Sequence, residues 1–255
     1  MDSFNPPTFM VGGPLEELEV DPEGNLHLLK ASLLGPGRAR FYWLELDRTG
    51  QVLDSTFVLP GETVGSVDPT TTLSALSPKG YVVSGRTDQY VLFLHREEGV
   101  VQIRHEWEPV EYKREERREK QFLAEVMSDR TGRPEGRIGQ TKPAFKALFV
   151  DSEGRFWIER YAEGHNEGES PGEESRRLEG CRFMGASRAE CDKGIRTWHD
   201  ELVFDVLGTE GTYIGTLRFP TRRTKIWHAA GSTLWVTEQN EYDESFVVRY
   251  RIERP

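Results

Sequence analysis

Short runs of apolar and β-branched residues alternate along this chain with tight, polar turns. Seven such turns occur at 21–24, 47–50, 77–80, 96–99, 151–154, 208–211 and 229–232. Six of them end in glycine, and four begin with Asp or Ser. Turn formers between runs rich in Val, Ile, Phe, Tyr and Trp are typical of β-hairpins. The pattern therefore predicts an all-β protein.

Two predicted strands flank each turn, and one more strand ends the chain. The predicted strands are 15–20, 26–29, 41–46, 52–58, 73–76, 81–83, 90–95, 100–103, 145–150, 156–158, 202–207, 213–219, 225–228, 234–236 and 246–252. Some runs, such as 148–150, are apolar throughout, which suits strands covered on both faces. A hairpin cannot bury its apolar face alone, whereas stacked hairpins can.

Pairs of hairpins group the strands into four units, at about 14–60, 72–106, 143–220 and 224–253. Four-stranded antiparallel sheets arranged radially form a β-propeller, and we predict this fold for residues 1–255 as a single domain. The last unit shows three strands. Residues 9–11, within an N-terminal extension at 1–13, are the candidate strand that completes it. A two-sheet sandwich is the alternative.

The long connections all fall at the junctions opposite the glycine turns. They are 30–40, 61–71, 84–89, 107–144, 160–200, 220–224 and 237–245. In a propeller these loops emerge on one face, and long loops of a compact domain often bind partners. We therefore expect any ligand or partner to bind this long-loop face.

The two largest connections, 107–144 and 160–200, are predicted insertions. Residues 112–127 predict a helix, in which Glu116 and Lys120 form an i,i+4 pair. The charge run 113–120 mixes both signs and favours a solvated helical face over a nucleic-acid surface. The Glu-, Gly- and Ser-rich residues 163–179 predict a mobile segment.

The composition disfavours some classes of binding partner. The chain has 33 Lys and Arg against 43 Asp and Glu, which gives a formal net charge of −10. Such a protein is a poor general partner for nucleic acid or anionic lipid. No apolar run reaches the length that spans a bilayer. Residues 1–7 show no signal-peptide pattern.

The two cysteines, Cys181 and Cys191, lie in one polar segment. They are either a local disulfide, as in an exported protein, or two reduced thiols in a loop. Metal binding by these two alone is disfavoured, because no Cys/His partner set lies near them in the sequence.

Basic residues gather on the connections of the long-loop face and favour a small anionic ligand or a protein partner. His228 lies on a predicted inner strand beside them. The predicted binding residues are Arg86, Asp88, Lys142, Arg222, Lys225 and His228, with Phe122 and Met127 as apolar contacts. Trp157 and Trp235 follow glycine turns on second strands, where we expect them to be core residues between sheets.

Several phrases resemble bacterial six-bladed β-propellers of the NHL and SMP-30/gluconolactonase-like kind. They are Trp107-Glu108-Pro109-Val110, Lys142-Pro143-Ala144-Phe145, residues 149–158, residues 75–80, residues 85–90 and residues 204–219. The resemblance covers about 14–253 and implies an exported bacterial protein. The chain departs from it in showing four units instead of six, so it is either a piece of a six-bladed ring or a shortened variant.

The gluconolactonase-like members hold a divalent metal in the central channel through oxygen ligands of the innermost strands. The resemblance thus implies, as an alternative function, a lactonase-like hydrolase with Ca²⁺ or another divalent metal. Among the predicted innermost strands, only 15–20 supplies carboxylates, at Glu16, Glu17 and Glu19. Hard cations need several converging oxygen ligands. We therefore expect no metal or cofactor, and we favour a non-enzymatic binding propeller.

Overall fold

The structure is a computed structural model, and the part of the chain that it describes is not continuous. It covers residues 18–20, 25–35, 38–47, 49–58, 72–131, 138–168, 171–183, 192, 198–219, 224–240 and 244–253. Within these ranges the side chains at 18–20, 29–35, 38–41, 56–58, 72, 123, 126–131, 176, 180–183 and 227 lie outside the description.

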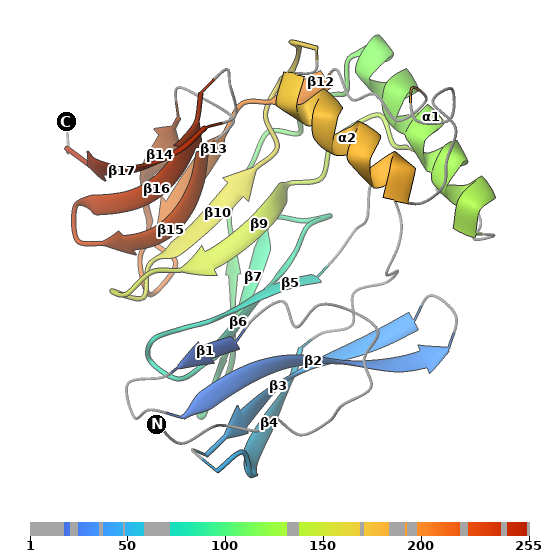
Figure 1. Ribbon diagram of the computed structural model, residues 1–255. Coiled ribbons are helices and arrows are strands. Elements are labelled where there is room, and N and C mark those ends of the chain that lie inside the picture. Colours follow the sequence, from blue (N-terminus) through green and yellow to red (C-terminus); the bar gives the residue numbers. More distant parts are fainter. Residues whose placement is uncertain are drawn as a thin grey trace.

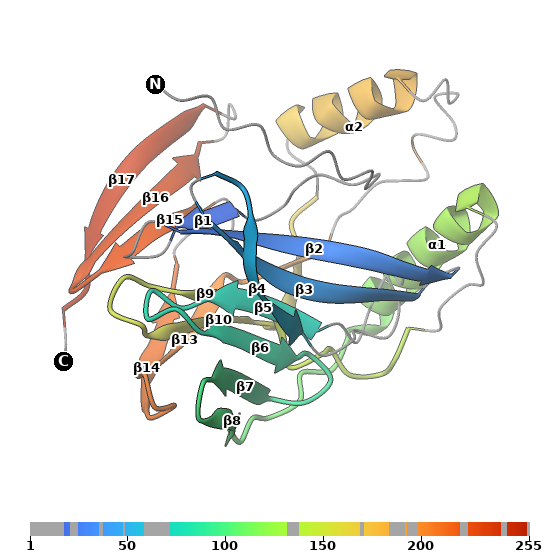
Figure 2. The same cartoon turned by 90° about the horizontal axis from the view of Figure 1, so that it is seen from below.

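The predicted all-β propeller is confirmed. Four small antiparallel sheets are arranged as a four-bladed propeller ring, with two helices beside them (Figures 1 and 2). The first sheet contains β1 (Leu18–Val20), β2 (Leu26–Gly35), β3 (Arg38–Leu46) and β4 (Val52–Val58). The second contains β5 (Thr72–Leu76), β6 (Val82–Arg86), β7 (Val91–Arg96) and β8 (Gly99–Arg104).

The third sheet contains β9 (Phe145–Val150), β10 (Phe156–Arg160), β13 (Val203–Leu207) and β14 (Tyr213–Arg218). The fourth contains three described strands, β15 (Thr224–Ala230), β16 (Thr233–Gln239) and β17 (Ser245–Arg251). In each sheet the strands pair in chain order. The proposed closing strand at 9–11 lies outside the described residues and stays a prediction.

The two insertions carry both helices and a short ribbon. They are α1 (Arg114–Thr131), α2 (Pro171–Phe183), β11 (Gly164–Asn166) and β12 (Trp198–Asp200). The helix predicted at 112–127 is thus present, shifted by a few residues. β11 and most of α2 form within 163–179, the segment that the sequence predicted to be mobile. The expected excursion at 30–40 is wrong, because β2 and β3 extend into it as a paired hairpin.

The turns owe their shape to their own side chains. The Asp151 carboxylate accepts hydrogen bonds from the Glu153 and Arg155 amides and from the Trp157 indole Nε1, at 2.8–2.9 Å. Asp47 likewise accepts from Thr49 and Gln51, and the hydrogen bond from the Thr49 side chain is the main cause that lowers the Asp47 pKa. Short polar side chains that mimic a backbone turn explain these positions.

The turns meet on one side of the propeller, which we call the turn face. Ser152 N donates to Ala229 O at 3.4 Å, and Arg96 Nη2 donates to Thr209 O at 3.2 Å, so that turns of different sheets touch. The helices lie on the opposite side (Figures 1 and 2). We keep the name long-loop face for that side.

Hydrophobic clusters join neighbouring sheets in sequence. Trp43 packs with Leu76 and Val82 between the first and second sheets. A larger cluster that includes Leu92, Leu94, Phe145 and Phe156 lies between the second and third sheets. Another cluster, built on Trp157, Phe204, Leu234 and Val236, joins the third and fourth. Among the described residues, no such cluster joins the fourth sheet to the first.

We call the interface between two neighbouring sheets a joint. A side-chain hydrogen bond crosses each of the first two joints. Trp43 Nε1 donates to Ser74 Oγ at 3.2 Å across the first joint, and the Tyr90 hydroxyl donates to Asp205 Oδ2 at 2.8 Å across the second. Burial, then the negative charge of Asp205, raises the Tyr90 pKa far above its usual value. Tyr90 therefore stays a neutral donor at physiological pH.

Trp157 is fully buried, as predicted, whereas the prediction for Trp235 is wrong. Trp235 is 42% exposed, because its face of β16 is not covered by another described sheet. No helix in the described part of the chain is long and apolar enough to cross a bilayer.

Candidate functional site

The first turn of α1 is fixed by a carboxylate. Glu116 Oε2 accepts a hydrogen bond from the Lys113 backbone amide at 3.2 Å, in the manner of a capping interaction. A negative charge in the first turn also suits the helix dipole. The other oxygen, Oε1, lies 2.6 Å from Lys142 Nζ. Glu116 therefore holds the start of the helix and anchors it to the propeller.

Lys142 is the centre of a buried ion cluster. Besides Glu116, its Nζ donates to Asp200 Oδ1 at 2.5 Å and to the Ala162 carbonyl at 2.8 Å. An ammonium group has three donors, and all three are used. A buried charge is tolerated only when it is paired and hydrogen-bonded in this way. The cluster connects α1, the segment before β9 and the ribbon of β11 and β12.

Gly164 leaves room for this cluster. A Cβ added at Gly164 would lie 2.6 Å from Glu116 Oε2, closer than real Cβ contacts allow. Outside the cluster, Lys113 pairs with Glu163 at 2.7 Å and lies 5.8 Å from the centre of the Trp198 ring. The hydrogen bond from Lys113 lowers the pKa of Glu163. The ribbon and the helix are thus held together from both sides.

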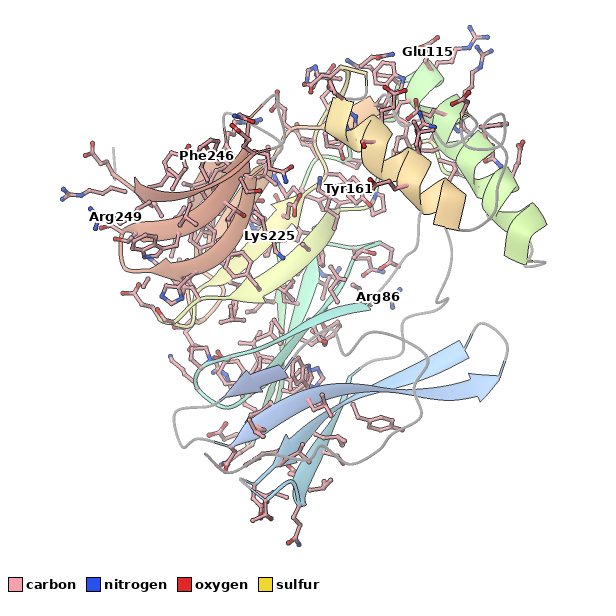
Figure 3. All side chains as sticks on the ribbon, viewed as in Figure 1. Arg86, Glu115, Tyr161, Lys225, Phe246 and Arg249 are labelled. Atoms are coloured by element: carbon pink, nitrogen blue, oxygen red, sulfur yellow. The ribbon has the colours of Figure 1, made fainter. Side chains whose placement is uncertain are left out.

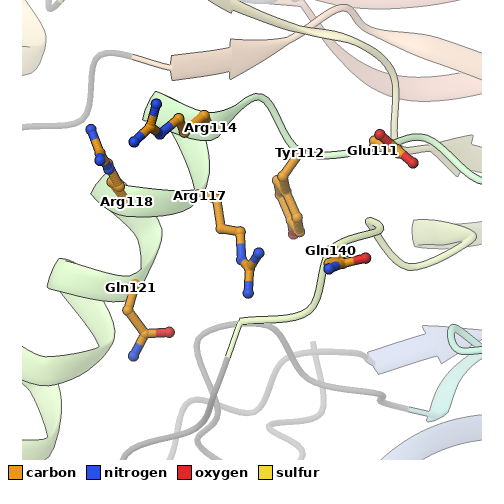
Figure 4. Close-up of a pocket in the computed structure, with 7 residues that line it drawn as sticks. All are labelled: Glu111, Tyr112, Arg114, Arg117, Arg118, Gln121 and Gln140. Carbon is orange, nitrogen blue, oxygen red and sulfur yellow. The ribbon is translucent and has the colours of Figure 1, made fainter.

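Beside this support, α1 and the loop before β9 enclose an open pocket of about 860 Å³. Figure 4 shows the residues that line it; they are Glu111, Tyr112, Arg114, Arg117, Arg118, Gln121 and Gln140. We call this the arginine pocket. It lies in the insertion 107–144, on the long-loop face.

The helix places its pocket residues by spacing alone. Arg114, Arg117, Arg118 and Gln121 stand at i, i+3, i+4 and i+7, and so share one face of α1. Arg117 Nε donates to the carbonyl of buried Ile138 at 3.3 Å, and Gln121 Oε1 accepts from the Ile138 amide at 3.0 Å. These two bonds hold the opposite wall of the pocket against the helix.

The pocket is positively charged. Three arginines face one glutamate, within a chain whose net charge is −10. Arg114 and Arg118 are exposed and form no ion pair with any described residue. Guanidinium groups bind carboxylate and phosphate oxygens in a bidentate way and remain charged at all ordinary pH values. This arrangement suits the binding of an anion.

The structure separates the predicted binding residues. Arg86 and Asp88 are exposed and pair with each other at 2.6 Å. Lys142 is wholly buried with all its donors engaged, so it does not offer the exposed contact that we predicted. Lys225 and His228 lie on the exposed side of β15 (Figure 3 labels Lys225). Arg222 lies outside the described residues.

The remaining predicted residues lie partly inside and partly outside the described part of the chain. Phe122 is exposed on α1, as an apolar contact requires, and the Met127 side chain lies outside the description. Cys191 and the Cys181 side chain also lie outside it, so the disulfide stays a prediction. Across the described residues, no group of three His, Cys, Asp or Glu side chains could hold a metal ion. The Glu16, Glu17 and Glu19 side chains are not among them.

Sequence reasoning missed Arg114, Arg117 and Arg118 as a set. It treated the run 113–120 as a solvated helical face, which describes the charges but not their arrangement. The i, i+3, i+4 spacing of the three arginines was the available signal. The opposite wall, which includes Gln140, has no local signal because it comes from a separate loop.

We compared the chain with known protein families, curated proteins and solved structures, and the matches are to solved structures at low sequence identity. No protein-family model matches the chain, and no curated protein matches it. Among solved structures, a catalytically inactive virginiamycin B lyase from Staphylococcus aureus with quinupristin matches at 9% identity and a TM-score of 0.34, over 96% of this chain and 59% of that one. The calcium-binding protein regucalcin from Agrobacterium tumefaciens matches at 15% identity and 0.33, over 87% and 52%.

A luciferin-regenerating enzyme matches at 12% identity and a TM-score of 0.34, over 91% of this chain and 59% of that one. These structures are six-bladed propellers, and the chain spans less than two thirds of the length of each of the three.

Proposed function

We propose that this protein is a non-enzymatic binding propeller that holds an anionic ligand in the arginine pocket of its long-loop face. The observation that carries the proposal is the set of three arginines on one face of α1 around an open pocket of about 860 Å³. A pocket of this size accommodates a small molecule.

The support beneath the pocket favours binding without large rearrangement. The buried cluster of Glu116, Lys142 and Asp200 fixes the first turn of the helix, where Arg114 and Arg117 begin the pocket wall. Arg117 is further positioned by its bond to the Ile138 carbonyl. Preorganised donors lose less conformational entropy when a ligand binds, which raises affinity.

The ligand class follows from the donors. Arginine guanidinium groups and the Gln140 amide offer several N–H donors to planar oxyanions, and Glu111 is the one acidic group of the lining. Polycarboxylates and phosphates are the anions that match this set. Because the pocket is open to solvent, its affinity for them falls as ionic strength rises.

Isothermal titration calorimetry with citrate and with pyrophosphate tests the proposal. The double substitution Arg114→Glu with Arg118→Glu should weaken binding at least about tenfold, a loss of about 1.4 kcal/mol. The matched control is Arg249→Glu with Arg251→Glu on β17, which changes the net charge equally and should leave binding intact. Equal loss in both variants would show that total charge, and not the pocket, governs binding.

A further inference from the structure

The fourth sheet ends in a strand with one unpaired edge. β17 pairs with β16, and no other described strand pairs with it. The other three sheets each carry a fourth strand at the corresponding place, as β4, β8 and β14. The position beside β17 is therefore open within the described part of the fold.

The direction of the backbone groups of β17 follows from one hydrogen bond. Ile252 N donates to Ser232 O at 2.7 Å, which makes these two residues a hydrogen-bonded pair. Inward and outward groups alternate along an antiparallel strand. The N–H and C=O groups of Val247, Arg249 and Arg251 consequently point away from β16, toward the open edge. Such an edge is a template for an added strand.

Basic, aromatic and apolar side chains lie on one face of this sheet. Register places His228 opposite Trp235, and Trp235 opposite Arg249, so the three share one face. The guanidinium of Arg249 lies 5.9 Å from the centre of the Trp235 ring. Val247, two residues along β17 on the same face, is 71% exposed. Figure 3 labels Arg249 and Phe246 on β17 and Lys225 on β15.

The face is basic and aromatic, in contrast to the acidic chain as a whole. Lys225, opposite Thr237, adds a third cation to Arg249 and Arg251. None of the positions that share this face on the three described strands holds Asp or Glu. Edge arginines repel a second copy of the same edge, which disfavours pairing of two identical chains. They attract a strand that carries acidic side chains.

We propose that β17 is a docking strand for an acidic, extended segment of a partner protein. The segment adds antiparallel to β17 as the fourth strand of the last sheet, with main-chain hydrogen bonds to Val247, Arg249 and Arg251. Its alternate side chains, two residues apart, are acidic and face Arg249 and Arg251. This is β-strand addition, in which the backbone supplies affinity and alternate side chains supply specificity. It does not depend on the arginine pocket, and it replaces residues 9–11 as the expected occupant of the position beside β17.

Fluorescence anisotropy with a labelled seven-residue peptide of alternating glutamate and valine tests the proposal on the full chain. Arg249→Glu with Arg251→Glu should weaken binding at least about tenfold. Val247→Pro should abolish it, because proline removes an outward N–H that the added strand needs. Proline is tolerated at such edge positions, so the fold should be retained, as circular dichroism will check. The matched control is Lys79→Glu with Arg104→Glu, two exposed cations outside both proposed binding surfaces, and it should bind the peptide as the unmodified chain does.

A second measurement is independent of substitution. In the unmodified chain, the peptide should slow amide hydrogen exchange at Val247 and Arg249 and leave α1 unchanged. Equal affinity for a lysine–valine peptide, or full binding by Val247→Pro, would overturn the proposal. So would binding that appears only after residues 1–13 are deleted, since the chain's own N-terminal segment would then hold the edge. Absence of any binding would overturn it as well.

Discussion

Glu116 Oε1 lies 2.6 Å from Lys142 Nζ, and both side chains are almost completely inaccessible to solvent. The two residues are 26 positions apart in the sequence. Asp200 completes the cluster from a strand farther along the chain. One buried ammonium thus pairs with two carboxylates that come from two separate insertions.

We expect Lys142→Met to destabilise the protein by about 3–5 kcal/mol, because it leaves two carboxylates without their cation in a buried site. Urea unfolding measures the change. Lys146→Met is the matched control, since Lys146 is partly exposed and lies 3.8 Å from Asp200. Its cost should stay within about 1 kcal/mol. Similar costs for both substitutions would argue that water reaches the cluster.

Trp157→Ala should cost about 3–5 kcal/mol. The ring is fully buried, stacks on Phe149 at 5.5 Å, and its Nε1 donates to Asp151. Trp235→Ala, in contrast, should cost less than about 1 kcal/mol, because surface substitutions have small effects. Thermal or urea unfolding of the pair measures the difference, and equal losses would mean that the exposed face of β16 is covered in solution.

Two turn glycines, Gly80 and Gly211, allow the cost of backbone strain to be distinguished from the cost of steric crowding. Gly80 and Gly211 have φ of +81° and +85°, where an added Cβ is strained in either turn. A Cβ at Gly80 would touch nothing within 4 Å, whereas one at Gly211 would lie 2.6 Å from Ile103 Cγ2. We expect Gly80→Ala to cost about 1–2 kcal/mol. Gly211→Ala should cost more, by about 1–3 kcal/mol, through overpacking. Unfolding midpoints in urea test the order.

The buried hydroxyl of Tyr90 predicts a pH dependence. Because the folded-state pKa is raised above the ordinary value of about 10, both states keep the proton below pH 10 and Tyr90 adds no pH dependence there. Above pH 10 the unfolded chain loses the proton and the folded chain keeps it. Stability should then fall by about 1.4 kcal/mol per pH unit on account of this group.

Tyr90→Phe lacks this dependence, and it also lacks the bond to Asp205. At pH 8 it should be about 1–3 kcal/mol less stable than the unmodified chain, because Asp205 loses a buried donor. Between pH 10 and 11 the gap should narrow. The free energies of unfolding of the two proteins, measured across that pH range, test this prediction. A constant difference between them would mean that the Tyr90 pKa is not raised.

The strands were predictable because their signals are local. β4 and β9 have the limits that the sequence predicted, since each begins or ends beside a tight turn. β11 and β12 were missed, because each has three residues, too few to carry a periodic signal. They form where Lys142 and Lys113 hold their neighbours Ala162, Glu163 and Asp200.

The candidate site was less predictable, because exposure depends on residues distant in the sequence. Lys142 is the type of residue that often contacts an anionic ligand. In the structure it is buried and paired with Glu116 and Asp200. Trp235 looks like a core residue on its strand, and only the absence of a covering sheet among the described residues leaves it exposed. The arginines of α1 were visible as a pattern, but the loop that completes their pocket was not.

The three joints between successive sheets differ in size, and this has a consequence for how the molecule opens. Among the side chains that the structure describes, the joint between the first and second sheets rests on Trp43, Leu76 and Val82, whereas eleven buried side chains form the next one. Sub-global unfolding begins where the fewest apolar contacts must be broken. The first sheet should therefore detach as a cooperative unit while the other sheets stay folded, and the amides of β2 and β3 should take up deuterium well before those of β9 and β10.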